Sequence, residues 1–172
     1  FVGPAVAWEI TFLEHYQSFG FETGSPEHEG YAAELEATQA SVKRMREAGI
    51  RVLVGGDYGL NITPHGTYAK ELQYFTDYFG FSAGEALQAA TKHGGEAFMP
   101  DGSLGTLEAG KIADMVIVKG NPLEQIGVLQ DADAIAAVIK EGQIYTGLLD
   151  NQSPHQKNAE QLNQLLGARP CN

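Results

Sequence analysis

The chain has 172 residues, of which 43% are hydrophobic, and a formal net charge of −11 with an isoelectric point near 4.7. This composition suits a globular protein with a sizeable core and excludes a disordered or fibrous chain. The negative charge argues against nucleic acid and anionic membranes as partners, so we expect a small-molecule partner. No apolar run approaches the roughly 20 residues of a membrane span, and we expect a soluble, cytoplasmic protein.

The amino-terminal part of the chain predicts a strand followed by a long helix. Residues 1–8 suggest a strand that runs into a loop, in which Pro4 fits only an edge or a strand end. Because the chain starts in what looks like the middle of a strand, we expect it to belong to a longer protein. The Ser-Pro-Glu segment at 25–27 is typical of a helix start, and apolar residues then recur every three or four positions until Gly49.

A short apolar run that ends in two glycines and a carboxylate follows this helix. Residues 52–54 predict a strand buried on both faces, connected to the first strand by a parallel crossover. Gly55 and Gly56 let the backbone bend sharply or come close to a ligand. Asp57 would then stand at the carboxyl end of the strand, where α/β enzymes place their chemistry. The alternative is that Asp57 is only a turn former or the cap of the next helix.

Two helices are predicted after this loop. An apolar stripe at helical spacing indicates the first helix and its packing in the core; its members are Tyr68, Leu72, Phe75 and Phe79. Ser82 and Glu85 have the spacing of a capping box and open the second helix. We expect the glycine pair at 94–95 to end it.

The carboxyl-terminal third predicts a small β unit and a polar tail. Residues 115–118, 135–139 and 143–146 read as strands, the last two joined as a hairpin. We expect these strands to pair with one another, apart from the strand at 52–54. Residues 150–172 are rich in Asn and Gln and carry a weak helical stripe, so this tail can form a final helix.

Four stretches, in their order and spacing, resemble a known family. They are Gly-Gly-Asp at 55–57, Ser-x-x-Glu-Ala-Leu-x-Ala-Ala-Thr at 82–91, Gly-Thr-Leu-Glu-Ala-Gly-Lys-Ile-Ala-Asp at 105–114 and Asn-Pro-Leu at 121–123. Together they resemble the carboxyl-terminal part of the metal-dependent amidohydrolases, closest to the imidazolonepropionase-like and prolidase-like branch. The resemblance covers roughly residues 51–146.

The resemblance implies an α/β fold that is a partial (β/α)8 TIM barrel plus part of a small composite β-sandwich. The last two strand-helix units of the barrel would be present, with the seventh strand near residues 2–7 and the eighth at 52–54. Residues 1–100 would form the barrel part and residues 101–149 the sandwich part. The polar tail at 150–172 would follow them.

The resemblance also implies a reaction and a role for Asp57. Such enzymes hydrolyse carbon–nitrogen bonds in non-peptide amides, cyclic amides or dipeptide-like molecules with one or two divalent metals, usually zinc. The Asp after the eighth strand binds the metal and takes the proton of the attacking water, then passes it to the leaving amine. This chemistry agrees with what a carboxylate beside a metal-activated water can do. We therefore expect Asp57 to be a metal ligand and a catalytic residue.

The family's other metal ligands have no counterpart in this sequence. They are a His-x-His after the first strand, a Lys or Glu after the fourth, and single histidines after the fifth and sixth. The five histidines here are scattered, with no pair two or four positions apart. We expect this segment alone to hold no metal and to be inactive, and the missing amino-terminal part of the same protein to be its partner. A homo-oligomer stays open as a further form of assembly.

His65, Trp8 and Glu9 are the candidates for contact with substrate, because they follow predicted strand ends or lie in the Asp57 loop. A second hypothesis remains beside the hydrolase. The segment can be a non-catalytic assembly or binding module derived from an amidohydrolase barrel, at the cost of an exposed strand on an incomplete barrel.

Overall fold

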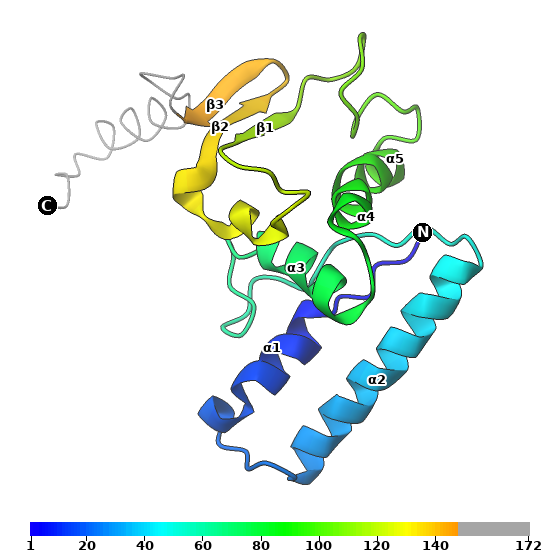
Figure 1. The fold of residues 1–172 in the computed structure, drawn as a ribbon, viewed down its shortest axis with the longest axis vertical. Helices are drawn as coiled ribbons and strands as arrows, with labels where there is room; N and C mark the ends of the chain where they lie inside the picture. Colours follow the sequence, from blue (N-terminus) through cyan, green and yellow to red (C-terminus); the bar gives the residue numbers. More distant parts are fainter. Residues whose placement is uncertain (148–172) are drawn as a thin grey trace, which may run out of the picture.

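The computed structural model describes residues 1–147, and the helix expected within 150–172 lies outside the described residues. The α-helices are α1 (Ala7–His15), α2 (Pro26–Glu47), α3 (Ala69–Tyr78), α4 (Ala83–Gln88) and α5 (Gly94–Phe98). The strands are β1 (Met115–Val118), β2 (Ile135–Lys140) and β3 (Gln143–Gly147). Helices α1 and α2 lie side by side at one end and the three strands at the other, with α3, α4 and α5 between them (Figure 1). No helix within residues 1–147 is both long enough and apolar enough to cross a membrane.

The two strands expected near residues 2–7 and 52–54 are reduced to a single parallel bridge between Val2 and Val52. The Val2 amide donates to the Arg51 carbonyl at 3.0 Å, and the Leu53 amide donates to the Val2 carbonyl at 2.7 Å. The expected seventh strand is therefore wrong beyond its first residues. Proline at position 4 has no amide to donate, and Ala5 has a φ of +51°, so the chain leaves the extended conformation and enters α1.

The core of the helical part lies where α1, α2 and α3 face one another and the Val52 bridge. Its largest fully buried apolar side chains are Val6, Ile10, Val42 and Phe75. Helix α2 begins as expected from its sequence, because the Ser25 side chain accepts from the His28 amide at 3.3 Å. The α2 stripe buries Leu35 and Val42 against this core.

The helix that starts at Ser82 has the expected capping box but not the expected end. The Ser82 side chain accepts from the Glu85 amide and the Glu85 side chain accepts from the Ser82 amide. The glycine pair at 94–95 does not end the helix, which passes through the π-helical segment η2 (Ala89–His93) into α5. A Cβ on Gly95 would lie 2.5 Å from the Leu104 carbonyl oxygen, so this glycine allows the following loop to pack directly on the helix.

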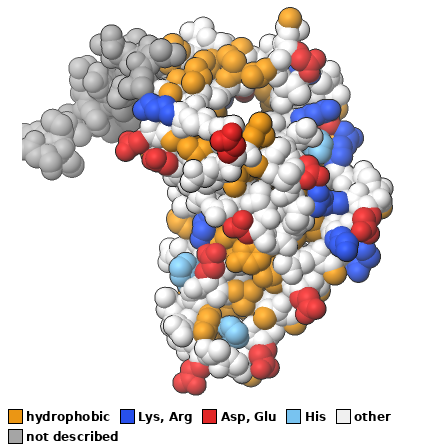
Figure 2. Space-filling model, in the orientation of Figure 1, with side chains coloured by type: hydrophobic (Ala, Val, Ile, Leu, Met, Phe, Trp, Pro, Cys, Tyr) orange, Lys and Arg blue, Asp and Glu red, His pale blue; other side chains and the backbone are white. Residues whose placement is uncertain are grey.

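The three strands form an antiparallel sheet in the order β1-β2-β3, with Met115 opposite Ile139 and Val138 opposite Thr146. The expected pairing is confirmed, and the sheet does not include the Val52 bridge. Exposure does not alternate along β1, because Val116 is 56% and Ile117 42% exposed. Figure 2 shows hydrophobic side chains gathered over this region. Among residues 1–147 no second sheet covers the exposed side chains of β1. The described fold is a partial α/β structure.

The sheet unit contacts the helical part through the 3₁₀ segment η3 (Ile126–Gln130), which packs on α3. Gln130 Nε2 donates to Gln73 Oε1 at 2.6 Å, and Ile126 is buried in the core shared with α3. Helix α3 therefore contacts the core on one side and the sheet unit on another. It also directly follows the loop that carries Asp57. Helix α3 thus connects this loop to both the core and the sheet unit.

Candidate active site around Asp57

Asp57 lies on the carboxyl side of the Val52 bridge with its side chain exposed. No hydrogen bond or ion pair joins its carboxylate to any side chain or amide among residues 1–147. Helix α3 begins at Ala69 with Tyr68 as its N-cap residue, so Asp57 does not cap it. The helix-cap alternative is wrong, and the carboxylate is left on an open face of the described chain.

The main chain of Asp57 is held by the loop that follows it. Thr63 is 2% exposed, and its Oγ1 donates to the Asp57 carbonyl at 2.6 Å. The Gly59 amide donates to the Thr63 carbonyl at 2.9 Å, and the Thr63 amide donates to the Leu60 carbonyl at 3.1 Å. The loop is closed on itself by these bonds, so the backbone from which the Asp57 side chain leaves has a defined conformation.

Glu71 is the acidic residue that the sequence did not single out. It lies in the first turn of α3, is 1% exposed, and its carboxyl group packs against Gly56. A Cβ on Gly56 would lie 3.2 Å from Glu71 Oε2, 2.9 Å from the Ala7 Cβ and 2.7 Å from Tyr58 Cε2. The second glycine therefore allows α1, α3 and the loop to approach one another closely.

Burial raises the pKa of Glu71 to about 7, because a charged carboxylate is poorly solvated there. The amides of Gly56 and Gly55 and the hydroxyl of Tyr58 act in the opposite direction, since they favour the charged form. Burial also raises the pKa of Tyr58, and the neighbouring Glu71 raises it further. Glu71 Oε1 and Tyr58 Oη are both buried without a hydrogen-bond partner in the part of the chain that the structure describes.

A sequence signal for Glu71 does exist. Glu71 directly precedes Leu72 in the apolar stripe and lies four residues before Phe75, so a helix places it at the edge of the buried face. A carboxylate at such a position is either exposed at the rim or buried with a polar partner. Spacing alone cannot distinguish these two cases.

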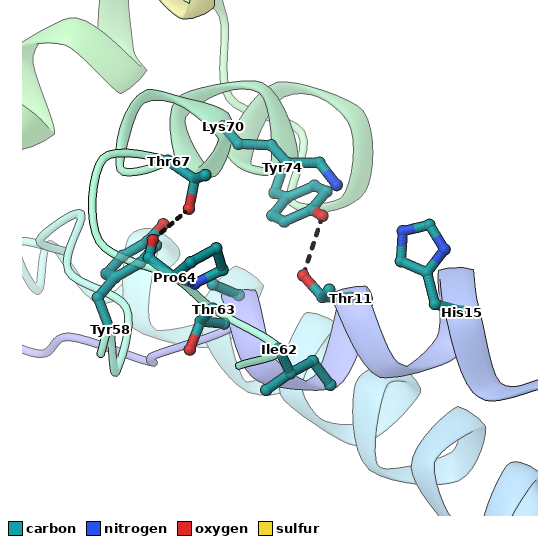
Figure 3. Close-up of a pocket in the computed structure, with 10 residues that line it drawn as sticks. Thr11, His15, Tyr58, Ile62, Thr63, Pro64, Thr67, Lys70 and Tyr74 are labelled. Atoms are coloured by element: carbon teal, nitrogen blue, oxygen red, sulfur yellow. Dashed lines mark hydrogen bonds between the residues drawn. The ribbon is translucent and has the colours of Figure 1, made fainter. Parts of the chain in front are cut away.

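A cavity of about 210 Å³ adjoins the loop that carries Asp57. It is lined by Ala7, Thr11 and His15 of α1, by Tyr58, Ile62, Thr63, Pro64 and Thr67 of the loop, and by Lys70 and Tyr74 at α3. Figure 3 shows Thr11 and His15 projecting from α1 toward Tyr74 and Lys70. Asp57 itself does not line the cavity, although the neighbouring Tyr58 does.

The polar groups at one end of this cavity are paired with one another. Lys70 Nζ donates to Glu14 Oε2 at 2.7 Å, and the Tyr74 hydroxyl donates to the same oxygen at 2.9 Å. Thr11 Oγ1 lies 3.2 Å from the Tyr74 hydroxyl. Burial lowers the pKa of Lys70, but the hydrogen bonds with Glu14 and Tyr74 outweigh it and the net pKa is raised. The cation is thus neutralised by Glu14.

The structure separates the three residues expected to contact substrate. His65 is exposed in the Asp57 loop, where its Nδ1 lies 2.7 Å from the Tyr68 hydroxyl. Trp8 Nε1 donates to the Tyr31 hydroxyl of α2 at 3.3 Å. Glu9 accepts from Thr38 Oγ1 of α2 at 3.4 Å, and burial, followed by the nearby Glu34, raises its pKa. His65 therefore shares a loop with Asp57, whereas Trp8 and Glu9 face α2.

The described residues do not form a metal site by themselves. Within residues 1–147 no cluster of three or more His, Cys, Asp or Glu side chains is placed to hold a metal ion. Protein zinc sites use three or four protein ligands. The Asp57 carboxylate has the right chemistry for one of them, and the others are not found in this part of the chain.

Comparison with known proteins identifies the family. The sequence profile of the amidohydrolase family matches residues 16–145. An ochratoxinase from Aspergillus niger is 34% identical over 114 residues, covering 66% of this chain and 22% of that protein. An imidazolonepropionase from Symbiobacterium thermophilum is 30% identical over 110 residues, covering 64% of this chain and 26% of that protein.

Solved structures agree with these matches. The structure of a Xaa-Pro dipeptidase with bound methionine is similar with a TM-score of 0.64 and 29% identity, covering 84% of this chain and 34% of that one. The chain spans about a quarter of the length of the two curated relatives. The resemblance seen in the sequence is confirmed, and the chain belongs to the amidohydrolase family.

Proposed function

We propose that the chain is part of a metal-dependent hydrolase that cleaves a carbon–nitrogen bond in a small molecule. Membership of the amidohydrolase family supports hydrolysis of such bonds, and the similar proteins are named as an ochratoxinase, an imidazolonepropionase and a Xaa-Pro dipeptidase. These names favour an amide, cyclic amide or dipeptide-like substrate.

The exposed Asp57 carboxylate carries this proposal: it lies on the carboxyl side of the Val52 bridge and has no hydrogen-bond or ion-pair partner among residues 1–147. The Asp57 main-chain carbonyl accepts a hydrogen bond from Thr63, so the backbone that carries the carboxylate is restrained. We assign Asp57 two roles. It supplies one oxygen ligand to a divalent metal, for which zinc is the family's usual choice, and it accepts the proton of the attacking water.

The remaining ligands would come from parts of the protein outside residues 1–147, since the described part offers no cluster that could hold a metal. A divalent metal supplies an activated water at neutral pH. The role of Asp57 in the reaction is proton transfer. A positioned carboxylate in this role typically raises the reaction rate by about 10²-fold to 10⁴-fold. A substrate could contact two features on or beside the Asp57 loop: the cavity lined in part by Tyr58, and the exposed His65.

The experiment compares Asp57→Asn with Asp77→Asn in the protein that contains this chain. Asp77 is an exposed carboxylate on α3 whose side chain accepts from its neighbour Thr76, so its replacement controls for loss of surface charge. We expect Asp57→Asn to lower kcat about 100-fold or more and Asp77→Asn to leave it unchanged. Equal activity of the two variants against amide and dipeptide substrates would refute the role of Asp57.

A further inference from the structure

We infer that Glu71 is a positioning residue for Asp57, because its buried carboxyl group packs against the backbone of Gly56, from which the Asp57 segment continues. The inference rests on the function proposed for Asp57. Glu71 Oε2 would lie 3.2 Å from a Cβ on Gly56, so the carboxyl group is in direct contact with this glycine. Gly56 directly precedes Asp57 in the chain.

The two glycine amides have no backbone acceptor among residues 1–147. The Val2 and Val52 bridge ends before them, so no ladder continues along this part of the chain. The Glu71 carboxyl group is the polar side chain close enough for both amides to act on its pKa. The buried Glu71 carboxyl group, in contact with Gly56, therefore lies where a strand partner would otherwise support this backbone.

The contact between Glu71 and Gly56 lies directly before Asp57 in the chain, so it restrains the backbone at the candidate site. Glycine is the residue with the greatest backbone freedom, and two in succession would otherwise leave Asp57 on a flexible segment. Glu71 restrains the chain just before Asp57, and Thr63 Oγ1 holds the Asp57 carbonyl just after it. The backbone that carries the exposed carboxylate is thus restrained on both sides of Asp57 by buried groups.

Packing alone does not account for a carboxyl group at this position. Glu71 is 1% exposed, and the neighbouring buried residues of α3 are Leu72, Tyr74 and Phe75. A leucine would fill a similar volume without the unfavourable burial of a carboxyl group. The Glu71 side chain is buried, whereas the Asp57 side chain is exposed, and no hydrogen bond joins the two carboxyl groups. The effect of Glu71 on the reaction must therefore pass through the backbone.

The test uses Glu71→Gln and Glu71→Leu in the protein that contains this chain. Glutamine keeps an acceptor oxygen for the glycine amides, whereas leucine keeps the volume and removes the acceptor. We expect Glu71→Leu to retain the thermal midpoint and KM but to lower kcat at least tenfold, and Glu71→Gln to recover most of that loss. Leu72→Ala is the control for destabilised packing of α3 and should lower the thermal midpoint while leaving kcat within twofold.

A second measurement separates this inference from the proposed function. Hydrogen exchange of the Gly55 and Gly56 amides should become at least tenfold faster in Glu71→Leu and stay unchanged in Asp57→Asn. Should the leucine variant fail to fold, Glu71→Asp withdraws the carboxyl by one methylene and should show the same faster exchange. If Asp57→Asn is fully active, the function proposed for Asp57 fails while the exchange result still tests the contact. Wild-type exchange and wild-type kcat in Glu71→Leu would overturn the role of Glu71.

Discussion

The Oγ1 atom of Thr63 donates a 2.6 Å hydrogen bond to the carbonyl oxygen of Asp57, six residues earlier in the chain. Thr63 is almost completely buried although its loop runs over the surface. Through this bond, the buried Thr63 side chain restrains the backbone of Asp57, whose carboxylate is exposed.

Replacing Thr63 with valine should loosen the loop without changing its shape. Valine has a similar volume but no hydroxyl, so the Asp57 carbonyl would lose its buried donor at a cost of about 1–3 kcal/mol in the free energy of unfolding. We also expect a lower kcat, because the Asp57 carboxylate would be less well placed. The control is Thr76→Val, which removes a hydroxyl that donates to the Gln73 carbonyl within α3. A Thr63→Val enzyme with wild-type kcat would contradict this role for the loop.

Substitution of the two glycines before Asp57 should have unequal effects. A Cβ at position 56 would lie 2.9 Å from the Ala7 Cβ and 2.7 Å from Tyr58 Cε2, whereas nothing lies within 4 Å of one at position 55. We expect Gly56→Ala to lower the free energy of unfolding by about 1–3 kcal/mol through overpacking. Gly55→Ala is the matched control and should be near neutral. Denaturant unfolding of both variants checks this. Equal stabilities would show that a methyl group fits at position 56 and that α1, α3 and the loop are not in close contact there.

Stability should depend on pH through Glu71. Its pKa in the folded chain is about 7 against an ordinary value of 4.5, so between these values the folded state binds more protons than the unfolded state. The free energy of unfolding should therefore fall as pH rises through this window, by an amount on the order of 3 kcal/mol for this group. The unfavourable contribution is complete above pH 7, and it is absent at pH below the ordinary value.

Glu71→Gln isolates this effect from the other titrating groups. Burial also raises the pKa of Glu9, while the hydrogen bonds of the Ser82 cap lower that of Glu85, so the wild-type curve alone mixes several contributions. Tyr58 is the titratable side chain that acts on Glu71 directly. We expect the stability of wild type relative to Glu71→Gln to decrease steadily from about pH 4 to about pH 8. A constant difference across that range would contradict a buried carboxyl with a raised pKa.

The candidates for contact with substrate should behave differently from one another. His65 lies in the Asp57 loop, so His65→Asn should raise KM several-fold if substrate enters beside this loop. Trp8 donates to Tyr31 of α2, so Trp8→Phe should cost about 0.5–1.5 kcal/mol in the free energy of unfolding and leave KM unchanged. Steady-state kinetics and thermal unfolding of both variants distinguish these outcomes. A raised KM in Trp8→Phe would show that substrate contacts the α1 face turned toward α2.

The features that sequence analysis predicted correctly depend on local interactions. The cap at Ser25, the capping box of Ser82 and Glu85 and the hairpin of β2 and β3 each involve residues close together in the chain. The extended length of the two barrel strands was overestimated, because a strand needs partners and the described residues provide only the Val2 and Val52 pair. Gly95 does not end the helix but leaves room for the Leu104 backbone to pack on it, a contact that no local pattern reveals.

The candidate site shows the same division between local and long-range information. Asp57 could be selected because a carboxylate after an apolar strand and two glycines is a local pattern. Glu71 could not, because the burial of an acidic side chain at the edge of a helix stripe depends on how α1 and the loop pack around it. Trp8 and Glu9 were selected because they follow a predicted strand end, but they lie inside α1 and bond to Tyr31 and Thr38 of α2.

Metal content measured together with hydrolysis tests the central claim, that Asp57 is a metal ligand and proton acceptor in an amidohydrolase. The measurement is made on the protein that contains this chain, in the wild type, in Asp57→Asn and in Asp77→Asn. We predict zinc or another divalent metal bound in stoichiometric amount in the wild type and in Asp77→Asn, with amide or dipeptide hydrolysis in both. Asp57→Asn should retain the fold, bind less metal and lose turnover by about 100-fold or more. A metal content and a kcat for Asp57→Asn equal to those of the wild type would contradict the account and favour a non-catalytic binding module.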